Sequence, residues 1–247
     1  MDRLVTSKGR LIGVGVGPGD PELMTLKAVR ALAAADVVAH FAKAGRESNA
    51  RQIALGHIRP DAIELPLGYP LTTELPKNDP AYRQATQTFF DEAAATIASH
   101  LDHGRTVAVL SEGDPLFYGS YMHIHVRLSY RYPTEVIAGV TSLSGCWSAA
   151  GIPIAQGDDI LAVLPATLPE ATLVGRLRTS DAAVMIKLGR NLAKARRALA
   201  AAGRLSAAIY VERGTMAEGR VLPLADKADD EAPYFAVVLV PGFEGRP

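Results

Sequence analysis

The sequence has a single cysteine, Cys146, among its 247 residues. One cysteine cannot form an internal disulfide bond or a cysteine-based zinc site, and this scarcity disfavours a secreted, disulfide-stabilised module. A surplus of charge is also lacking, since 26 Lys+Arg balance 26 Asp+Glu. Proteins that bind nucleic acid usually have an excess of positive charge, so no nucleic-acid partner is expected unless a local basic patch provides it.

Long apolar runs are absent as well. The segment before Gly13 has no apolar stretch of signal-peptide length, and no segment reaches the roughly 18 consecutive apolar residues that cross a bilayer. We therefore expect a cytoplasmic protein with no membrane partner. Because 48% of the residues are hydrophobic, the chain can bury a substantial core as one large domain or two small ones.

Apolar runs of strand length alternate with alanine-rich runs of helical period, which predicts an α/β fold. The predicted strands of the first half are 10–16, 36–41, 62–65, 105–110 and 134–138, and its helices are 21–34, 47–58, 80–101 and 116–129. The predicted strands of the second half are 159–164, 182–188, 206–212 and 234–240, and its helices are 141–150, 169–178 and 191–202. No full helix separates the strands between 203 and 240, so the second sheet should be mixed and the first mostly parallel.

Two α/β domains are expected, residues 1–117 and 118–247, because a Glu-Gly-Asp-Pro sequence at 112–115 interrupts a strand. A boundary near Tyr132-Pro133 is the alternative. The proline-containing stretch 66–80 predicts a long surface loop, a type of segment that often forms a lid or binding loop.

The first candidate binding motif is the glycine-dense turn from Gly13 to Pro21, between a predicted strand and helix. Glycines allow a ligand to approach the backbone closely, and the first N–H groups of a helix can face an anionic group. Pro18 and Asp20 occupy the places where a dinucleotide-binding motif needs its third glycine, and no Walker lysine follows. A ligand-binding turn is favoured over a purely structural one.

Two further motifs follow predicted strands. Residues 111–119 carry Glu112 and Asp114, which alternate along an extended segment, so at most one should face a given ligand. Asp114 alternatively only caps the next helix. Residues 138–147 contain a glycine turn followed by hydroxyl groups that bind a ligand or cap a helix, whereas Cys146 beside Trp147 is interpreted as a packed residue.

His123 and His125 follow on the predicted helix 116–129. They lie about 200° apart around a helix, so they do not share a metal ion, and no metal site is predicted. Each is either a proton acceptor near neutral pH or an ordinary surface residue. A later cluster of basic side chains can pair with carboxylates and consists of Lys187, Arg190, Lys194, Arg196 and Arg197, with Arg213 further on. For 194–197, a solvated helix face is the default interpretation.

In order and spacing, residues 15–25, 112–115 and 139–142 resemble the tetrapyrrole (corrin/porphyrin) methyltransferases, which use S-adenosylmethionine. The resemblance spans nearly the whole chain. Four stretches, 41–46, 111–123, 187–191 and 210–215, resemble the branch that methylates precorrin-2 at C-20 to give precorrin-3A in cobalamin biosynthesis. Many members have a second glycine where this chain has Glu112, so the role of that side chain stays open.

The resemblance implies an S-adenosylmethionine site in the cleft between two α/β domains, a homodimer, and precorrin-2 as substrate. The residues it places around the cofactor are Pro18, Glu112, Gly113, Asp114, Phe117, Thr141, Ser142, Leu188 and Gly214. The residues expected to contact the polycarboxylate substrate are Tyr118, Ser120, Arg127, Arg190 and Arg213. Glu112, His123 and His125 are the candidate catalytic residues, as acceptors of the proton lost after methylation.

Three alternatives stay open. A related methyltransferase would act at another ring position or on the cobalt-containing substrate, and the branch that methylates ribosomal RNA is disfavoured by the zero net charge. A non-catalytic protein would instead bind the tetrapyrrole or S-adenosylmethionine and sequester a labile intermediate.

Overall fold

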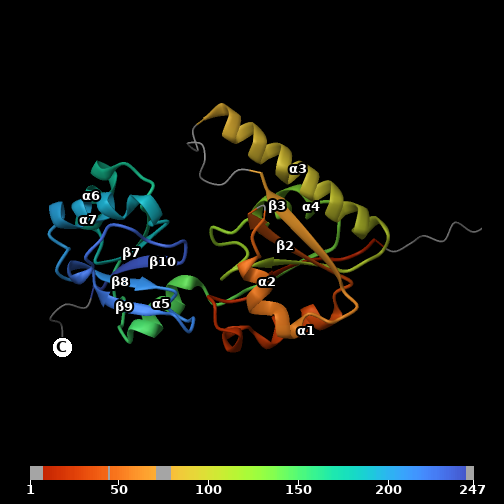
Figure 1. The fold of residues 1–247 in the computed structure, drawn as a ribbon, viewed down its shortest axis with the longest axis horizontal. Coiled ribbons are helices and arrows are strands. Elements are labelled where there is room, and N and C mark those ends of the chain that lie inside the picture. The colour runs from red at the N-terminus through yellow and green to blue at the C-terminus, as the bar shows by residue number, and fades with distance from the viewer. Residues whose placement is uncertain (1–7, 44, 71–78, 243–247) are drawn as a thin grey trace, which may run out of the picture. The chain divides into compact units, whose positions relative to one another are not determined.

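The computed structural model describes residues 8–43, 45–70 and 79–242. It divides into two compact units, residues 1–141 and 142–247. Each unit contains one five-stranded sheet covered by helices (Figure 1), which confirms the prediction of two α/β domains. None of the described helices is long and apolar enough to cross a membrane.

The sheet of the first unit is parallel throughout and has the strand order β3-β2-β4-β1-β5. Its strands are β1 (Leu11–Gly15), β2 (Val37–Lys43), β3 (Ile63–Tyr69), β4 (Val107–Ser111) and β5 (Thr134–Ile137). Its helices are η1 (Pro21–Leu23), α1 (Leu26–Ala34), α2 (Asn49–Ala54), η2 (Leu55–His57), α3 (Pro80–Asp102) and α4 (Tyr121–Leu128). Because all strands run the same way, the turns that follow them share one edge of the sheet.

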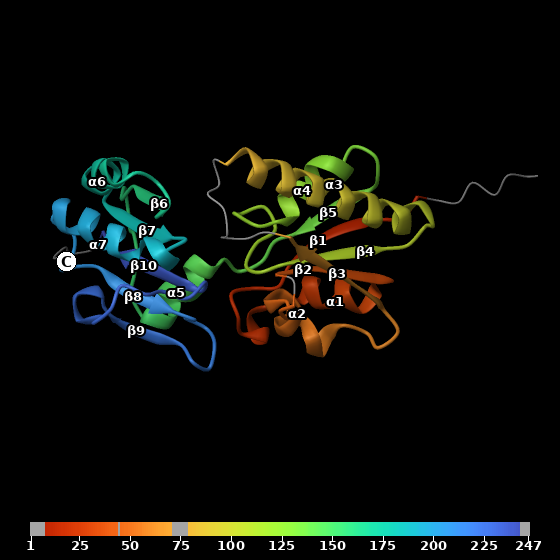
Figure 2. The same ribbon diagram turned by 45° about the horizontal axis from the view of Figure 1, so that its top comes forward.

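Both faces of this sheet are buried, as the near-continuous apolar strands predict. Val107 and Val109 of β4 pack on the side of α3 and α4, whereas Ala108 and Leu110 pack on the side of α1 and α2. Figure 2 shows the two helix pairs on opposite sides of the sheet. This alternation fixes which face each residue at the end of β4 can reach.

Three details of the first unit differ from the sequence-based prediction. The expected helix 21–34 is a 3₁₀ turn followed by α1, because Met24 is extended and the Thr25 hydroxyl accepts a hydrogen bond from Ala28 N at 3.1 Å, which starts a new helix. The expected helix 116–129 begins only at Tyr121. The predicted loop 66–80 belongs partly to β3, and its residues 71–78 lie outside the described residues.

The division between the units falls after residue 141, whereas the sequence-based boundary lies between 117 and 118. The later position has a physical reason. α4 packs against α3, and β5 pairs with β1 from Leu11↔Thr134 to Val14↔Ile137, so both elements complete the first unit.

The sheet of the second unit is mixed, as predicted, with the order β6-β7-β10-β8-β9. Its strands are β6 (Leu161–Pro165), β7 (Ala182–Ile186), β8 (Ile209–Glu212), β9 (Arg220–Pro223) and β10 (Ala236–Val240). Its helices are α5 (Ser142–Ala150), α6 (Glu170–Thr179), η3 (Gly189–Asn191), α7 (Leu192–Ala201) and η4 (Leu224–Asp226). Only β6 and β7 are parallel neighbours. Strand β9 was not predicted, because it is a short edge strand with mostly exposed side chains.

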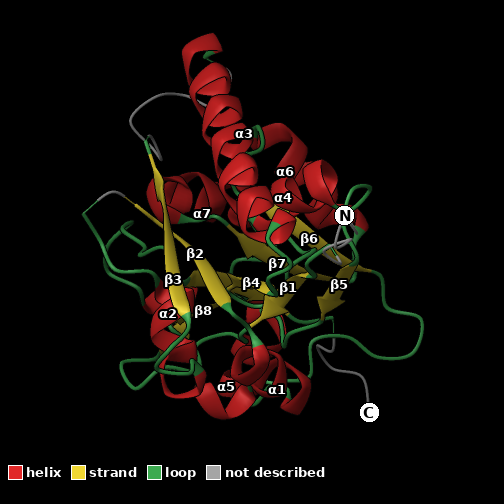
Figure 3. Ribbon diagram, turned by 90° about the vertical axis from the view of Figure 1, so that its right-hand side faces the viewer, coloured by secondary structure: helices red, strands yellow, loops and turns green. Residues whose placement is uncertain are grey.

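Helices cover both faces of the second sheet too (Figure 3). α6 and α7 pack on the face that includes Met185 and Val238, and α5 packs on the face that includes Val184 and Val237. The central strands β7 and β10 are therefore buried throughout, and so is the middle of β8.

Candidate active site

Turns that follow β1 and β4 are joined at the carboxyl edge of the first sheet. Val16 N donates to Ser111 O at 3.0 Å, and Gly113 N donates to Gly17 O at 2.7 Å, which extends the pairing past the strand ends. The first two sequence motifs thus form one structure. In open α/β sheets, ligands bind at this edge, so the motifs lie where a binding site is expected.

Three glycines allow the turns to pack backbone to backbone. A Cβ atom on Gly139 would lie 2.0 Å from Gly113 O, and one on Gly15 would lie 2.6 Å from the same oxygen. Gly113 also has a φ of +66°, a conformation that side chains disfavour. The turns at this point of the edge are therefore packed through backbone atoms, and they leave no room for side chains.

Asp114 holds two of these turns together. Its Oδ1 accepts a hydrogen bond from Leu116 N at 2.9 Å, and its Oδ2 accepts one from Gly139 N at 3.1 Å. The alternative that Asp114 caps a helix is not what the structure shows, since α4 begins only at Tyr121. The carboxylate instead fixes the turn after β4 to the turn after β5.

Glu112 extends toward α2. Burial raises the pKa of its carboxyl group, while hydrogen bonds from Ala50 N and from the Asn49 side chain act in the opposite direction. These contacts place the carboxyl group at the first turn of α2, so Glu112 and Asp114 are engaged with different elements. A role of Glu112 in catalysis or cofactor binding stays a prediction.

His123 and His125 have different surroundings on α4. The His123 ring stacks on Phe90 with centroids 4.0 Å apart, and burial together with the charge of Arg127 lowers its pKa. His125 Nδ1 lies 3.3 Å from the Tyr121 hydroxyl. Because the two rings contact different residues, each is a separate candidate for accepting a proton.

Arg127 is engaged within the first unit. Its Nε lies 2.7 Å from Asp91 Oδ1, and its Nη1 donates to His123 O at 3.0 Å. The pair joins α4 to α3 and offsets the positive charge. The structure therefore gives Arg127 a structural partner, and its contact with substrate stays a prediction.

Other candidate residues of the first unit lie in the turn after β4. Phe117 and Tyr118 are partly exposed and pack against each other with centroids 4.9 Å apart. The Ser120 hydroxyl contacts the Tyr69 hydroxyl at the end of β3. Nearby, the buried Ser111 Oγ has no hydrogen-bond partner. Pro18 is in the other turn, which follows β1, and it lies between Gly17 and Gly19, which both have positive φ.

The candidate residues of the second unit lie at the start of α5 and just after β7 and β8. Leu188 is buried in the core, and its carbonyl oxygen accepts a hydrogen bond from Asn191 N at 2.6 Å, so a contact of Leu188 with a cofactor stays a prediction. A Cβ atom on Gly214 would lie 3.1 Å from Cys146 Sγ, so glycine permits close packing against α5.

The two arginines proposed for substrate are in different surroundings. Arg190 in η3 is exposed, and Arg213 Nη1 lies 3.3 Å from Glu212 Oε1. Thr141 ends the first unit, and Ser142 begins α5.

Sequence reasoning missed Tyr121. Tyr121 is fully buried against Gly13, where a Cβ atom would lie 2.4 Å from its ring, and burial raises its pKa to about 12. No sequence motif indicates this contact, because the two residues are far apart in the chain. The sequence shows Lys187 as one member of the basic cluster at 187–197, but it does not show that the backbone of Lys187 has a positive φ of 58°.

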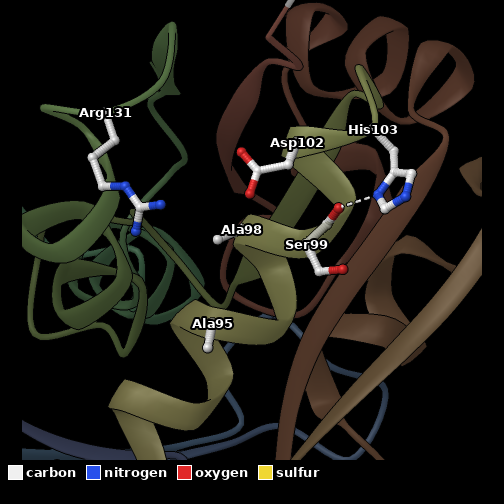
Figure 4. A pocket seen from close by; sticks show the side chains of 6 residues that line it. All are labelled: Ala95, Ala98, Ser99, Asp102, His103 and Arg131. Carbon is white, nitrogen blue, oxygen red and sulfur yellow. Dashed lines mark hydrogen bonds between the residues drawn. The ribbon is translucent and has the colours of Figure 1, made fainter.

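A hollow of about 350 Å³ lies elsewhere, beside the carboxyl end of α3 (Figure 4). Asp102 and Arg131 face each other across it, and His103 Nδ1 lies 2.6 Å from Ser99 O. These residues precede β4 and β5, so the hollow is at the opposite edge of the sheet from the glycine turns. Within residues 8–43, 45–70 and 79–242, no group of three or more potential metal ligands occurs.

Comparison with known proteins accounts for the arrangement of turns. The family model of tetrapyrrole (corrin/porphyrin) methylases matches residues 10–228. The chain is 63% identical over 239 residues to a precorrin-2 C(20)-methyltransferase from Sinorhizobium sp, covering 97% of this chain and 98% of that protein. It is 48% identical to the cobalamin biosynthesis protein CobIJ of Mycobacterium tuberculosis, covering 98% of this chain and 48% of that longer protein.

Solved structures share the fold. A cobalt precorrin-4 methyltransferase matches with a TM-score of 0.72 at 22% identity, covering 94% of each chain. A uroporphyrin-III C-methyl transferase from Thermus thermophilus, solved with S-adenyl homocysteine, matches with a TM-score of 0.63 at 25% identity, covering 94% of this chain and 97% of that one. The chain belongs to the tetrapyrrole (corrin/porphyrin) methylase family.

Proposed function

We propose that the protein transfers a methyl group from S-adenosylmethionine to C-20 of precorrin-2, giving precorrin-3A and S-adenosylhomocysteine. The observation that carries the proposal is the 63% identity to the Sinorhizobium enzyme over nearly the full length of both chains. The structure supports it with a glycine-walled edge in the first unit, where Gly15, Gly113 and Gly139 pack backbone to backbone and leave no room for side chains.

The residues at this edge fit a cofactor that is held largely by backbone. Close backbone packing at Gly15, Gly113 and Gly139 removes side chains from the wall, and the unpaired hydroxyl of Ser111 lies beside it. S-adenosylmethionine supplies an electrophilic methyl group on a sulfonium. The chain must then bind it, orient it, and bring the nucleophilic carbon into line; such positioning can lower a barrier by about 7–11 kcal/mol. In the second unit, Leu188 and Gly214 are proposed to contribute backbone contacts.

The meso carbon of precorrin-2 is enamine-like, so it needs no strong base before attack. A proton is lost after methylation, and His123 suits this step because burial keeps its pKa below the ordinary value and the imidazole neutral. His125 and Glu112 are the other proposed acceptors. A homodimer is proposed from the family resemblance alone.

The test is incubation of the purified protein with precorrin-2 and S-adenosylmethionine carrying a ¹³C-labelled methyl group. Mass spectrometry should show one added methyl group, and NMR should place it at C-20. A parallel reaction with cobalt-precorrin-2 identifies the preferred substrate. A methyl group at another carbon, preference for the cobalt complex, or cofactor binding without transfer would each contradict the proposal.

A further inference from the structure

The second unit holds two basic residues in an unusual backbone conformation. Among the described residues, those other than glycine with positive φ are Tyr118 at 56°, Lys187 at 58° and Arg213 at 48°. Lys187 directly follows β7, and Arg213 directly follows β8. A positive φ costs free energy in a residue that has a side chain, and residues in this backbone conformation cluster at functional sites.

The sheet brings these two residues to one edge. β7 and β8 both run antiparallel to β10, so they are parallel to each other and their carboxyl ends coincide. Ala236 of β10 pairs with Glu212 of β8, and Val238 of β10 pairs with Met185 of β7, so β7 and β8 both end near the start of β10. Because β10 lies between β7 and β8 and neighbouring strands are about 4.8 Å apart, the ends of β7 and β8, which Lys187 and Arg213 follow, are roughly 10 Å apart.

The charge at this edge is positive. Lys187 and Arg190 are exposed, and the Arg213 side chain retains 41% of its exposure. The adjacent acid is Glu212, whose side chain is only 13% exposed and accepts a hydrogen bond from the Tyr210 hydroxyl at 2.8 Å as well as contacting Arg213. That contact uses one Arg213 nitrogen, and a guanidinium has further N–H donors.

We propose that Lys187 and Arg213 form a two-point anchor for carboxylate groups of the tetrapyrrole substrate. The inference rests on the proposed function and assigns side chains to the recognition of its polyanionic substrate. Two cationic side chains that start from neighbouring strand ends suit a ligand with several carboxylates around a ring. The methionine end of S-adenosylmethionine suits them less, because it carries one carboxylate beside a positively charged ammonium group.

The test compares two ligands that require no turnover. Uroporphyrin III, a stable tetrapyrrole with eight carboxylates, is titrated by fluorescence, and S-adenosylhomocysteine is titrated by calorimetry. The variants Lys187→Asn and Arg213→Asn remove charge while keeping a residue that tolerates positive φ. Lys187→Arg keeps the charge. Arg176→Gln in the last turn of α6 is the matched control, since this exposed residue lies at the opposite edge of the sheet.

Each Asn variant should raise the Kd for uroporphyrin III about tenfold, as expected for loss of one charge-assisted contact. The Kd for S-adenosylhomocysteine should stay within about twofold, and Lys187→Arg and Arg176→Gln should bind like the parent. Because charges are screened by salt, the difference should shrink as ionic strength rises. With precorrin-2 as substrate, Lys187→Asn and Arg213→Asn should raise KM and leave kcat nearly unchanged.

The inference is overturned if both Asn variants bind uroporphyrin III as the parent does, or if they lose affinity for S-adenosylhomocysteine to the same or a greater extent. Equal binding of the uncharged octamethyl ester by the parent protein would overturn it too. Failure of the proposed function is seen separately, because it leaves these binding titrations measurable while precorrin-2 gains no methyl group.

Discussion

The Asp114 carboxylate bonds to the backbone of Gly139, with 3.1 Å between Oδ2 and the amide nitrogen, although the two residues are on different turns. Its other oxygen accepts a hydrogen bond from Leu116 N. One side chain therefore fixes the relative position of the turns after β4 and β5. These turns carry two of the three motifs that indicated a ligand site.

Asp114→Ala should consequently affect both stability and cofactor binding. Two backbone donors lose their acceptor, so the free energy of unfolding should fall by about 1–3 kcal/mol, and the affinity for S-adenosylhomocysteine should fall as the turns separate. Urea unfolding and calorimetry measure the two effects. Asp79→Ala, which removes a hydrogen bond to Ala81 N at the start of α3, is the control and should cost stability only. Equal ligand affinities in the two variants would refute this role of Asp114.

Gly139→Ala should be strongly destabilising. The added Cβ would lie 2.0 Å from Gly113 O, a backbone atom that cannot move without breaking the turn pairing. We expect a loss of about 3 kcal/mol in urea unfolding. Gly175→Ala in α6 is the matched control: no atom lies within 4 Å of its added Cβ, so it should gain up to about 1 kcal/mol. A Gly139→Ala variant as stable as the parent would show that the turns adapt.

Most of the fold could be predicted from the sequence because strand and helix periodicities are local properties. The apolar run at 105–110 predicts a strand that the structure places at Val107–Ser111 as β4, where buried residues face both sides of a parallel sheet. Strand β9 could not be found this way, since residues 220–223 are too exposed to show a periodic pattern. The division between the units was placed too early because the pairing of β5 with β1 connects residues far apart in the chain.

The candidate site was only partly predictable for the same reason. Glycine turns after strands mark the binding edge, and topology brings the turns together. The sequence does not show that Asp114 binds Gly139, that Glu112 reaches α2, or that Arg127 pairs with Asp91. Each of these depends on tertiary packing, which decides whether a polar residue is available to a ligand.

Cys146 should be unreactive in the folded protein. Burial raises its thiol pKa to about 11, so the thiolate fraction at pH 8 is about 10⁻³. We expect a disulfide reagent such as Ellman's to label the native protein at least about a hundredfold more slowly than the protein unfolded in urea. Cys146→Ser should retain methyl transfer. Rapid labelling of the native state, or loss of turnover without loss of folding, would contradict the interpretation of Cys146 as a packed residue.

The proton-acceptor role of His123 predicts a particular pH profile. Burial and the charge of Arg127 lower its pKa, so the imidazole is neutral at pH 7 and kcat should decline only below about pH 6.5. His123→Asn should lower kcat and abolish this decline, whereas Arg127→Gln should shift it to higher pH. His103→Asn, at the opposite edge, is the control. Unchanged turnover in His123→Asn would assign the role to another group.

Glu112 should make stability depend on pH in an identifiable direction. Burial raises its folded pKa above the unfolded value of about 4.3, so the neutral form is favoured in the fold. Its contribution to stability is therefore fully present below pH 4.3 and is lost as pH rises through the raised folded pKa. Glu112→Gln stays neutral at every pH and can still accept a hydrogen bond from Ala50 N. Urea unfolding of both proteins between pH 4 and pH 8 should show the variant gaining stability relative to the parent as pH rises. A constant difference across this range would mean that the carboxyl group titrates alike in the folded and unfolded states, and a difference of opposite sign would mean that its contacts with α2 outweigh burial.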